Sequence, residues 1–373
     1  MESYFLEAIF ILFPRQLLAE MRIILVTPSL SGCGGIEGLS SAVLNSLTQA
    51  GHTVILISLP SIKSFFFFRL LSVAIFYLKI YLHSFFCTHI LSMHPSLLKF
   101  VPDLLFRRLI STCWVHGIDV WGALPVNTIK SLRSYQLLIC SSRFTLSKMN
   151  EAYSFLRESR TAVLNPSIVN PIFIPLKNSS ATNPRCLHLL TVSRLSSDHQ
   201  YKGHDQIIAA LSLLKDIEWR WSVVGTGDDL MRLKDSVADN GLAESVHFFG
   251  ETSDSTLHHL YRDCSVFVMP SYFSALGCKS VTGEGFGIAY LEAAWAGKAS
   301  IASMAGGHTD LIQDGFNGWL VDESPESLAS LLRLLALNPH LVSSCGENAL
   351  LTAQHSFSYE AFQVKLNNLL LSI

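Results

Sequence analysis

The chain has 373 residues, of which 49% are hydrophobic and 15% charged, and its formal net charge is −2. A chain of this length exceeds one compact core, so we expect two domains. The near balance of acidic and basic residues, without long charged runs, does not indicate a nucleic-acid partner. The eight cysteines are scattered singly, without a CxxC or Cys/His cluster. We therefore expect no metal site and a reduced, cytosolic setting.

The first twenty residues, 1–20, form an N-terminal extension. Their apolar run Ala8–Phe13 follows Glu2 and Glu7 rather than a basic segment, which disfavours a secretory signal peptide. The stretch Met21–Thr27 has the composition of a first β-strand. Two interpretations stay open: Met21 is the functional start, or the extension is a loosely attached appendage.

Strands and helices alternate along the rest of the chain, which is typical of parallel sheets wound by helices. The first domain spans residues 21–180. Its predicted strands are Arg22–Thr27, Thr53–Leu59, Thr88–Met93, Ser111–Val115, Gln136–Cys140 and Thr161–Leu164, and its predicted helices include Gly38–Ala50, Ser96–Arg108 and Arg143–Ala152. Four prolines in Asn165–Pro184 indicate a linker.

A second α/β series makes up the domain 181–355. Its predicted strands are Leu187–Val192, Arg220–Val224, Val246–Phe249, Ser265–Met269, Ala299–Ala302 and Gly318–Val321. Its predicted helices are His204–Leu214, Asp228–Asp239, Ser255–Tyr261, Ile288–Ala296, Glu326–Leu337 and Leu341–Gln354. A C-terminal helix, Tyr359–Leu371 within 356–373, is expected to pack back on the first domain. The predicted fold is two Rossmann-like, parallel-sheet domains facing a central cleft.

A glycine-rich turn leads directly into a predicted helix in Gly283–Gly297, GEGFGIAYLEAAWAG. Glycines let a backbone approach a ligand closely, and a helix N-terminus offers unpaired N–H groups to an anion. Glu284 in the turn and Glu292 inside the helix can face one cleft, where a carboxylate accepts two hydroxyl protons of a sugar or ribose. The alternative, of equal weight for this segment alone, is an ordinary helix start in which Glu284 complements the dipole.

Arg194 and Lys202 lie in Val192–Asp205, a loop that follows a predicted strand and precedes a helix. Residues at the carboxyl end of a parallel strand point into the ligand crevice. A guanidinium and an ammonium aimed at a diphosphate would stabilise the charge that grows on a leaving group. Ordinary surface charge is the alternative, and it would be preferred for an isolated pair.

Further strand ends carry weaker candidates. Leu30–Glu37, LSGCGGIE, places Gly34 and Gly35 in a tight loop beside phosphate or acceptor, although the spacing is neither GxGxxG nor a P-loop. His116 lies at the crevice edge, where a lone histidine is otherwise structural. Gly225 and Gly227 suggest a dinucleotide loop, but the third glycine and the acidic residue after the next strand are absent. We interpret them as a tight turn lining the cleft.

Together these segments resemble the family-4 retaining glycosyltransferases of the GT-B fold. The most specific is the Glu-x7-Glu signature, here Glu284 to Glu292. SRL…YKGHD, the Met269–Pro270–Ser271 strand end, AGGHTDLIQDGFNGWLVD and the early Gly34–Gly35 loop fall in family order. The resemblance covers nearly everything from Met21 onward.

The resemblance implies an enzyme that transfers a sugar, with retention, from a nucleotide diphosphate donor to a glycan or lipid-linked acceptor in cell-surface polysaccharide or glycolipid synthesis. It implies that the first domain, 21–180, binds the acceptor and that the second, 181–355, binds the nucleotide sugar, without a metal or any other cofactor. The implied catalytic residues are Glu284, His116, Arg194 and Lys202. The implied donor-binding residues are Gly34, Gly35, Arg194 and Lys202 at the diphosphate side, Gly285, Phe286, Gly287 and Ile288 at the phosphate and transferred sugar, and Glu292 at the ribose.

The sequence departs from the family pattern in two places. Twelve residues separate Ser271 from Glu284, a longer loop than the shortest members have, and we expect it to shape donor choice. Asn165–Pro166–Ser167 replaces the usual Asn-Gly after the linker strand, so no role is assigned there. Three rival functions stay open: a nucleotide-sugar 2-epimerase of the same fold, a non-catalytic partner subunit, and a nicotinamide dehydrogenase that rests only on Gly225 and Gly227.

The aromatic stretch 64–87 raises the question of a membrane. Arg69 and Lys79 interrupt it, which argues against a spanning helix. A helix packed on the sheet is the favoured interpretation, and an interfacial helix resting on a bilayer is the alternative. The second would place a cytoplasmic protein at the inner face of the membrane, beside a lipid-linked acceptor.

Overall fold

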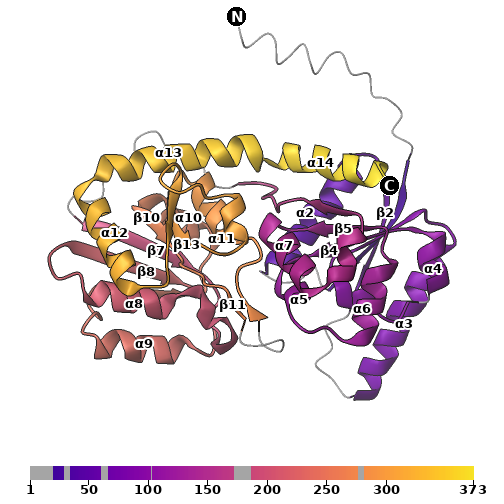
Figure 1. Ribbon diagram of the computed structural model, residues 1–373, viewed down its shortest axis with the longest axis horizontal. Helices are drawn as coiled ribbons and strands as arrows, with labels where there is room; N and C mark the ends of the chain where they lie inside the picture. The colour runs from indigo at the N-terminus through magenta and orange to yellow at the C-terminus, as the bar shows by residue number, and fades with distance from the viewer. Residues whose placement is uncertain (1–19, 29–33, 60–65, 102, 172–185, 276–280) are drawn as a thin grey trace, which may run out of the picture.

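The structure is a computed structural model that describes residues 20–28, 34–59, 66–101, 103–171, 186–275 and 281–373. The predicted extension therefore lies outside the described residues except for Glu20. So do most of the predicted linker and residues 29–33 of the first glycine-rich loop. Two α/β units lie side by side, and the chain crosses between them twice (Figure 1).

The first unit is built on a parallel sheet of six strands. They are β1 (Arg22–Thr27), β2 (Thr53–Ser58), β3 (His89–Ser92), β4 (Ile110–Val115), β5 (Leu137–Cys140) and β6 (Thr161–Val163). Their order is β2-β1-β3-β4-β5-β6. The central strands are buried along nearly their whole length, as expected for a parallel sheet covered on both faces.

The second unit repeats this plan with a second parallel six-stranded sheet. Its strands are β7 (Cys186–Val192), β8 (Glu218–Val224), β9 (Val246–Gly250), β10 (Val266–Val268), β13 (Ser300–Ser303) and β14 (Gly318–Val321). Their order is β14-β13-β10-β7-β8-β9. Read from the other edge, this is the order of a doubly wound sheet. Strands β8 and β9 are added on one side of β7, and β10, β13 and β14 are added on the other side.

Helices cover both sheets. In the first unit they are α2 (Gly35–Gln49), α3 (Phe66–Ser84), α4 (Asp103–Arg108), α5 (Ile118–Trp121), α6 (Val126–Ser134) and α7 (Arg143–Ala152). In the second they are α8 (His204–Ser212), α9 (Leu230–Asp239), α10 (Asp254–Asp263), α11 (Ile288–Trp295), α12 (Pro325–Leu337) and α13 (Pro339–Ser356). Short 3₁₀ turns are η1 (Pro95–Leu98), η2 (Ser154–Glu158), η3 (Ser197–Lys202) and η4 (Gly307–Asp310).

One predicted helix was wrong. Instead of a continuous helix over Ser96–Arg108, the chain forms η1 and then a separate α4. Pro102 stands between them, and proline has no N–H for an α-helical hydrogen bond and disfavours helical geometry in the residue before it. The sequence analysis also missed α6 and a small antiparallel hairpin, β11 (Ser274–Ala275) with β12 (Val281–Thr282), in the long loop before Glu284.

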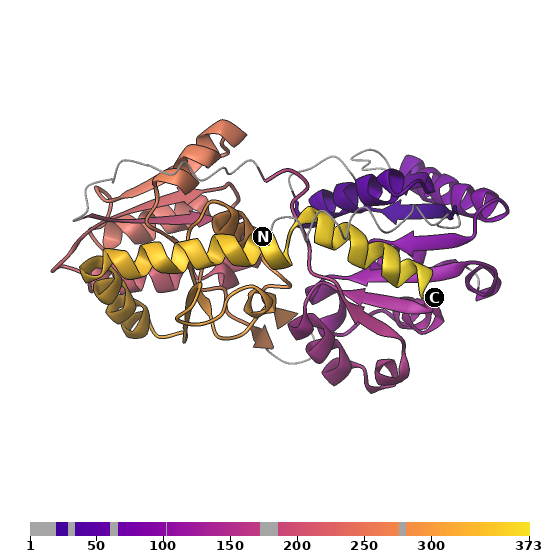
Figure 2. The same ribbon diagram turned by 90° about the horizontal axis from the view of Figure 1, so that it is seen from above.

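The last helix, α14 (Tyr359–Leu371), returns to the first unit. It continues the line of α13 across both units, as the two views show together (Figures 1 and 2). The Tyr359 hydroxyl donates a hydrogen bond to the Ala42 carbonyl at 3.1 Å, and Phe362 stacks on Trp114 with ring centroids 6.0 Å apart. Leu366 is fully buried. The end of the chain thus completes the hydrophobic core of the first unit.

Among the described residues, no single helix is long and apolar enough to cross a membrane. By length and composition alone, one pair of helices bent by 101°, Pro325–Leu337 with Pro339–Leu371, passes as a broken span. Leu328 and Leu332 on the first helix and Leu366 on the second are fully buried, so the pair forms part of the protein core.

Candidate active site

The carboxyl ends of both sheets face the space between the two units. The strand order reverses between β7 and β10 in the second sheet and between β1 and β3 in the first. Ligands of doubly wound sheets bind at such reversals. Arg194 and Lys202 follow β7, Gly34 and Gly35 follow β1, and His116 follows β4. The topology therefore gathers residues from distant parts of the sequence at one crevice.

Lys202 and Glu284 form an ion pair in this crevice. The Lys202 ammonium donates to the Glu284 carboxylate, and the two side chains are only 14% and 11% exposed. Burial by itself would lower the pKa of Lys202, but the attraction of Glu284 and Tyr201 outweighs it and raises that pKa above its usual value. The site thus holds a fixed, desolvated positive charge.

Arg194 stands beside this pair but is exposed. Within the part of the chain that the structure describes, its guanidinium has neither a hydrogen bond nor an ion pair. Burial lowers the pKa of the neighbouring His199, and the positive charges of Arg194 and Lys202 lower it further. An unpaired guanidinium next to a buried ammonium is suited to a ligand with several negative charges.

Glu292 lies within α11, on the side of α10. The Tyr261 hydroxyl donates to its carboxylate at 2.8 Å. Burial raises the pKa of Glu292 to about 7, although the bond from Tyr261 works in the opposite direction. The carboxyl group is therefore close to an even balance between its protonated and ionised forms near neutral pH, unlike an exposed glutamate.

The glycine-rich turn before α11 touches the first unit through its backbone. A Cβ on Gly285 would lie 1.9 Å from the His116 carbonyl oxygen, so only glycine fits there. A Cβ on Gly35 would lie 3.3 Å from Cδ1 of Ile288, which places the two predicted glycine loops together. Gly287, with φ of +86°, caps α11, and no side chain hydrogen-bonds to the cap. Phe286 is buried and packs near Phe357 instead of lining open space.

His116 is held in place by its own domain. Its Nε2–H donates to the Met93 carbonyl at 2.7 Å, which leaves Nδ1 as the acceptor facing the Ser141 hydroxyl at 3.3 Å. Asp119, which the sequence analysis did not single out, accepts hydrogen bonds from the backbone N–H groups of His116 and Gly117. Asp119 therefore fixes the loop that carries His116.

Direct hydrogen bonds join the two units beside the crevice. The Ser142 hydroxyl donates to the Gly285 carbonyl at 2.7 Å. Asp310 accepts from the backbone N–H of Arg143 at 2.9 Å and from the Asn165 amide at 2.8 Å. Asn165, to which no role was assigned, thus joins the two units. These partners come from separate sequence segments, and only a three-dimensional structure reveals them.

The long loop before Glu284 adds an aromatic contact. Phe273 of the second unit lies edge-on to Trp121 and Phe144 of the first, with ring centroids 5.6 and 5.3 Å away. The Lys148 ammonium lies 5.2 Å from the centroid of the Phe273 ring. Phe273 therefore acts as a bridge across the crevice, at the base of the β11–β12 hairpin.

Three further residues, Gly225, Gly227 and His308, have structural roles that their sequence motifs did not reveal. A Cβ on Gly225 would lie 1.8 Å from the Ser193 carbonyl oxygen, and one on Gly227 1.9 Å from that of Leu195. These glycines let the β8–α9 turn support the loop that carries Arg194. His308, buried behind the glycine-rich turn, donates from Nε2 to the Ser303 carbonyl at 2.7 Å.

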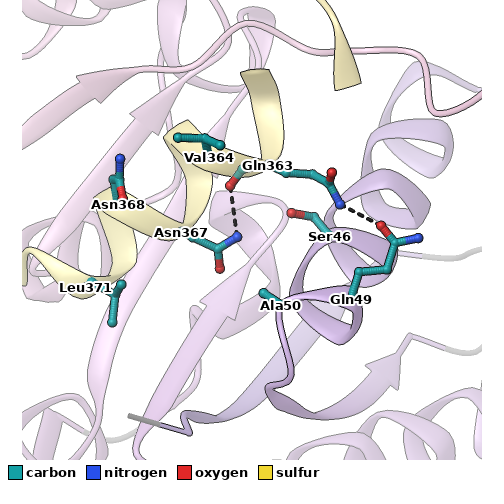
Figure 3. Close-up of a pocket in the computed structure, with 8 residues that line it drawn as sticks. All are labelled: Ser46, Gln49, Ala50, Gln363, Val364, Asn367, Asn368 and Leu371. Atoms are coloured by element: carbon teal, nitrogen blue, oxygen red, sulfur yellow. Dashed lines mark hydrogen bonds between the residues drawn. The ribbon is translucent and has the colours of Figure 1, made fainter. Parts of the chain in front are cut away.

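A hollow of about 380 Å³ lies elsewhere, between α2 and α14 (Figure 3). Five of its eight lining residues have polar side chains, and the Gln363 amide donates to the Gln49 side-chain oxygen across it at 2.6 Å. Its residues carry no charge, so it lacks the chemistry of the crevice. No group of three or more metal-ligating side chains occurs among the described residues.

The two facing parallel sheets define the GT-B fold, which confirms the predicted fold class. HepE from Anabaena, solved in complex with UDP and glucose, has a TM-score of 0.71 at 19% identity, over 95% of this chain and 100% of that one. Sucrose-phosphate synthase from Thermosynechococcus elongatus has a TM-score of 0.76 at 18% identity, over 94% of this chain and 98% of that one.

Sequence comparison points to the same class. Residues 176–351 match the family described as Glycosyl transferases group 1. An uncharacterised glycosyltransferase from Methanocaldococcus jannaschii is 31% identical over 178 residues, 47% of this chain and 42% of that protein. The GDP-mannose-dependent alpha-(1-6)-phosphatidylinositol monomannoside mannosyltransferase of Mycolicibacterium smegmatis is 28% identical over 252 residues, 64% of each chain. The chain spans less than two thirds of the length of either relative.

Proposed function

We propose that the chain is a retaining glycosyltransferase of family 4. It moves a sugar from a nucleotide diphosphate donor to a glycan or lipid-linked acceptor in polysaccharide or glycolipid synthesis. The observation that carries this proposal is the buried Lys202–Glu284 pair beside the unpaired Arg194, at the strand reversal of the second sheet. A diphosphate is the ligand class that two adjacent cations at such a crevice recognise best.

The residues suggest a division of labour. Arg194 and Lys202 hold the diphosphate and stabilise the negative charge that grows on it as its bond to the sugar breaks. The backbone N–H groups at the start of α11, around Gly287 and Ile288, add further donors for phosphate. Once the diphosphate engages Lys202, the Glu284 carboxylate is released to accept hydroxyl protons of the transferred sugar.

The remaining site residues complete the donor pocket. Glu292 accepts hydroxyl protons of the nucleotide ribose. His116, Gly34 and Gly35 approach the sugar and phosphate from the first unit. The names of the relatives leave the base open, since HepE was solved with UDP and the mycobacterial relative is GDP-mannose-dependent. No metal ion takes part, because leaving-group charge is stabilised by the side-chain cations.

A panel of radiolabelled UDP-, GDP- and ADP-sugars tests the proposal. One donor should bind, compete with its free nucleoside diphosphate, and lose affinity in Arg194→Ala, while binding and transfer persist in EDTA. Labelled epimer from donor alone would favour a 2-epimerase. Binding without turnover on any glycan or lipid-linked acceptor would favour a partner subunit. Absence of binding by the whole panel contradicts the proposal.

A further inference from the structure

The outer side of the first unit carries an apolar surface formed by α3 and its neighbour α4. Both helices lie on the side away from the second unit (Figure 1). One face of α3 packs into the core through Phe76 and Ile80, which are almost fully buried. The opposite face exposes six large apolar side chains: Leu70, Leu71, Ile75, Leu78, Tyr81 and Leu82.

The spacing of these residues makes one continuous face. At about 100° per residue, these positions together with the aromatic pair after the helix fall within roughly half of the helix circumference. Phe85 and Phe86 continue the surface beyond the helix, and Phe86 is 70% exposed. A surface helix of a globular protein normally carries polar residues on its outward face, whereas α3 carries leucine and aromatic side chains there.

The surface extends from α3 to α4 through aromatic contacts. The Tyr77 ring lies edge-on to Phe100, with centroids 5.9 Å apart, and Phe100 is itself exposed. The Arg108 guanidinium covers the Phe85 ring at 4.5 Å. Leu104 of α4 is 78% exposed. The apolar area is therefore shared between two elements and is not a property of α3 alone.

The charges around this surface have one sign. Lys79, Arg107 and Arg108 are exposed at its border. No aspartate or glutamate occurs in the sequence between Glu37 and Asp103, a stretch that contains all of α3. Exposed phenylalanine and leucine with basic residues at the rim match the boundary between acyl chains and anionic headgroups.

A second copy of this chain fits the same surface poorly. A two-fold dimer brings the same patch of both copies together. Lys79, Arg107 and Arg108 would then face their own equivalents across the interface, with no carboxylate from the stretch between Glu37 and Asp103 to neutralise them. Charge complementarity therefore favours an anionic lipid surface over self-association.

We propose that α3 and α4 form a docking surface for an anionic membrane, with α3 lying in the plane of the bilayer interface. The chain enters α3 after β2, so the start of the helix lies at the sheet edge that faces the crevice. Docking by this surface would hold the crevice beside the bilayer. The consequence that the acceptor is carried by a membrane lipid rests on the proposed function, whereas the docking surface itself does not.

The test is flotation of the full chain with vesicles of phosphatidylcholine and phosphatidylglycerol in equal parts, without donor. The wild type should float with these vesicles and much less with phosphatidylcholine alone. Leu78→Gln with Leu82→Gln should lower the partition coefficient at least about tenfold, because two leucines no longer enter the acyl region. Lys79→Gln with Arg107→Gln should weaken binding only to the anionic vesicles.

Matched controls separate a loss of binding from a loss of folding. Leu334→Gln with Leu337→Gln changes two exposed leucines of α12 in the second unit and should float like the wild type. All variants should keep the wild-type unfolding temperature, because the replaced side chains are exposed to solvent. Sedimentation velocity should show the same oligomeric state with and without the two α3 leucines.

Failure of the wild type to float, or unchanged flotation of the Leu78/Leu82 variant, overturns the docking surface. A dimer that the Leu78/Leu82 variant dissociates, without flotation, would assign the surface to a second copy instead. Because no donor is present, these outcomes are independent of the proposed activity. Donor turnover without flotation would contradict only the docking surface. Flotation without donor binding would contradict only the proposed transferase activity.

Discussion

The two sides of the crevice belong to similar folds but carry different chemistry. On the second unit, Arg194, Lys202 and Glu284 place full charges at the strand reversal. On the first unit, the corresponding positions hold His94 and His116. Burial is the main cause that lowers the pKa of His94; the negative charge of Asp119 opposes it, and the neighbouring His116 and Lys99 add to the lowering. The His94 imidazole is therefore neutral near neutral pH.

This difference teaches how one architecture can serve two kinds of ligand. The charged side is suited to an anion that leaves with its negative charge. The side with neutral imidazole and hydroxyl groups, such as His94 and Ser96, is suited to hydroxyl groups of a sugar or glycan. The difference predicts that substitutions on the second unit weaken the stabilisation of the leaving diphosphate. Substitutions at contacts between the units should instead disturb the alignment of donor and acceptor.

The largest effect is expected from removing the cations. Lys202→Ala and Arg194→Ala should each lower kcat by about 10²–10³-fold, because charge on the leaving diphosphate loses a stabilising partner. Steady-state kinetics with the identified donor measure this. Arg333→Ala, which removes an exposed ion pair with Asp216, is the matched control and should keep full activity. Wild-type turnover in a folded Lys202→Ala enzyme would remove the diphosphate assignment.

A smaller loss is expected where the two units meet. In Gly285→Ala the new Cβ would collide with the His116 carbonyl oxygen, a backbone atom that moves only with its whole loop. Misalignment on this scale lowers turnover by about 10²-fold. Donor affinity should fall less than kcat, since most donor contacts belong to the second unit. Gly38→Ala, with no atom near its added Cβ, is the control.

Glu292 allows the charged side to be tested by pH. Its pKa is raised by burial from 4.5 to about 7, so the folded protein holds this proton more tightly than the unfolded chain does. The contribution of Glu292 to stability therefore falls as pH rises from about 4.5 to about 7, and levels off above that. The free energy of unfolding of Glu292→Gln relative to the wild type should therefore rise by on the order of 3 kcal/mol across this window.

Denaturant unfolding of both proteins at several pH values measures that difference, in which the other ionisable groups largely cancel. Glu326→Gln is the control. The pKa of this exposed glutamate is lowered by hydrogen bonds from its own backbone and from Ser324, so the substitution should not stabilise the protein at neutral pH. A pH-independent difference between Glu292→Gln and the wild type would show that Glu292 is ionised throughout.

The smallest effect concerns the aromatic bridge. Phe273→Ala removes two edge-to-face ring pairs between the units, together worth roughly tenfold in the equilibrium between closed and open forms. We expect a higher KM for the acceptor with a smaller change in kcat. Phe249→Ala, a half-exposed phenylalanine of β9, should change neither. Small-angle scattering that shows no greater opening in Phe273→Ala would contradict the bridge.

The fold could be predicted from the sequence because its main signals are local. Strands such as Arg22–Thr27 and helices such as Arg143–Ala152 follow from short runs of residue types, and the structure has both within the predicted bounds. The predicted site residues follow strand ends, and the topology brings those ends together. The contacts of Asp119, Asn165 and Phe273 depend on partners distant in sequence, so no local pattern could reveal them.

The exposed face of α3 shows a different limit. The sequence indicated an apolar helix that either packs on the sheet or rests on a bilayer. The structure shows that the helix packs on the sheet through Phe76 and Ile80 and still has a second apolar face, so the two alternatives were not exclusive. Periodicity could not separate them, because leucine and phenylalanine occur on both faces.

The return of α14 has a consequence for engineering. The simplest chimera that exchanges the nucleotide-binding unit with that of a relative would be cut once, at the linker. In this protein such a cut would transfer Tyr359, Phe362 and Leu366 with the foreign half, although these side chains complete the core of the resident half. A second junction between Phe357 and Ser358 would leave α14 with the core it fills, and the exchangeable cassette would then be an internal segment of the gene.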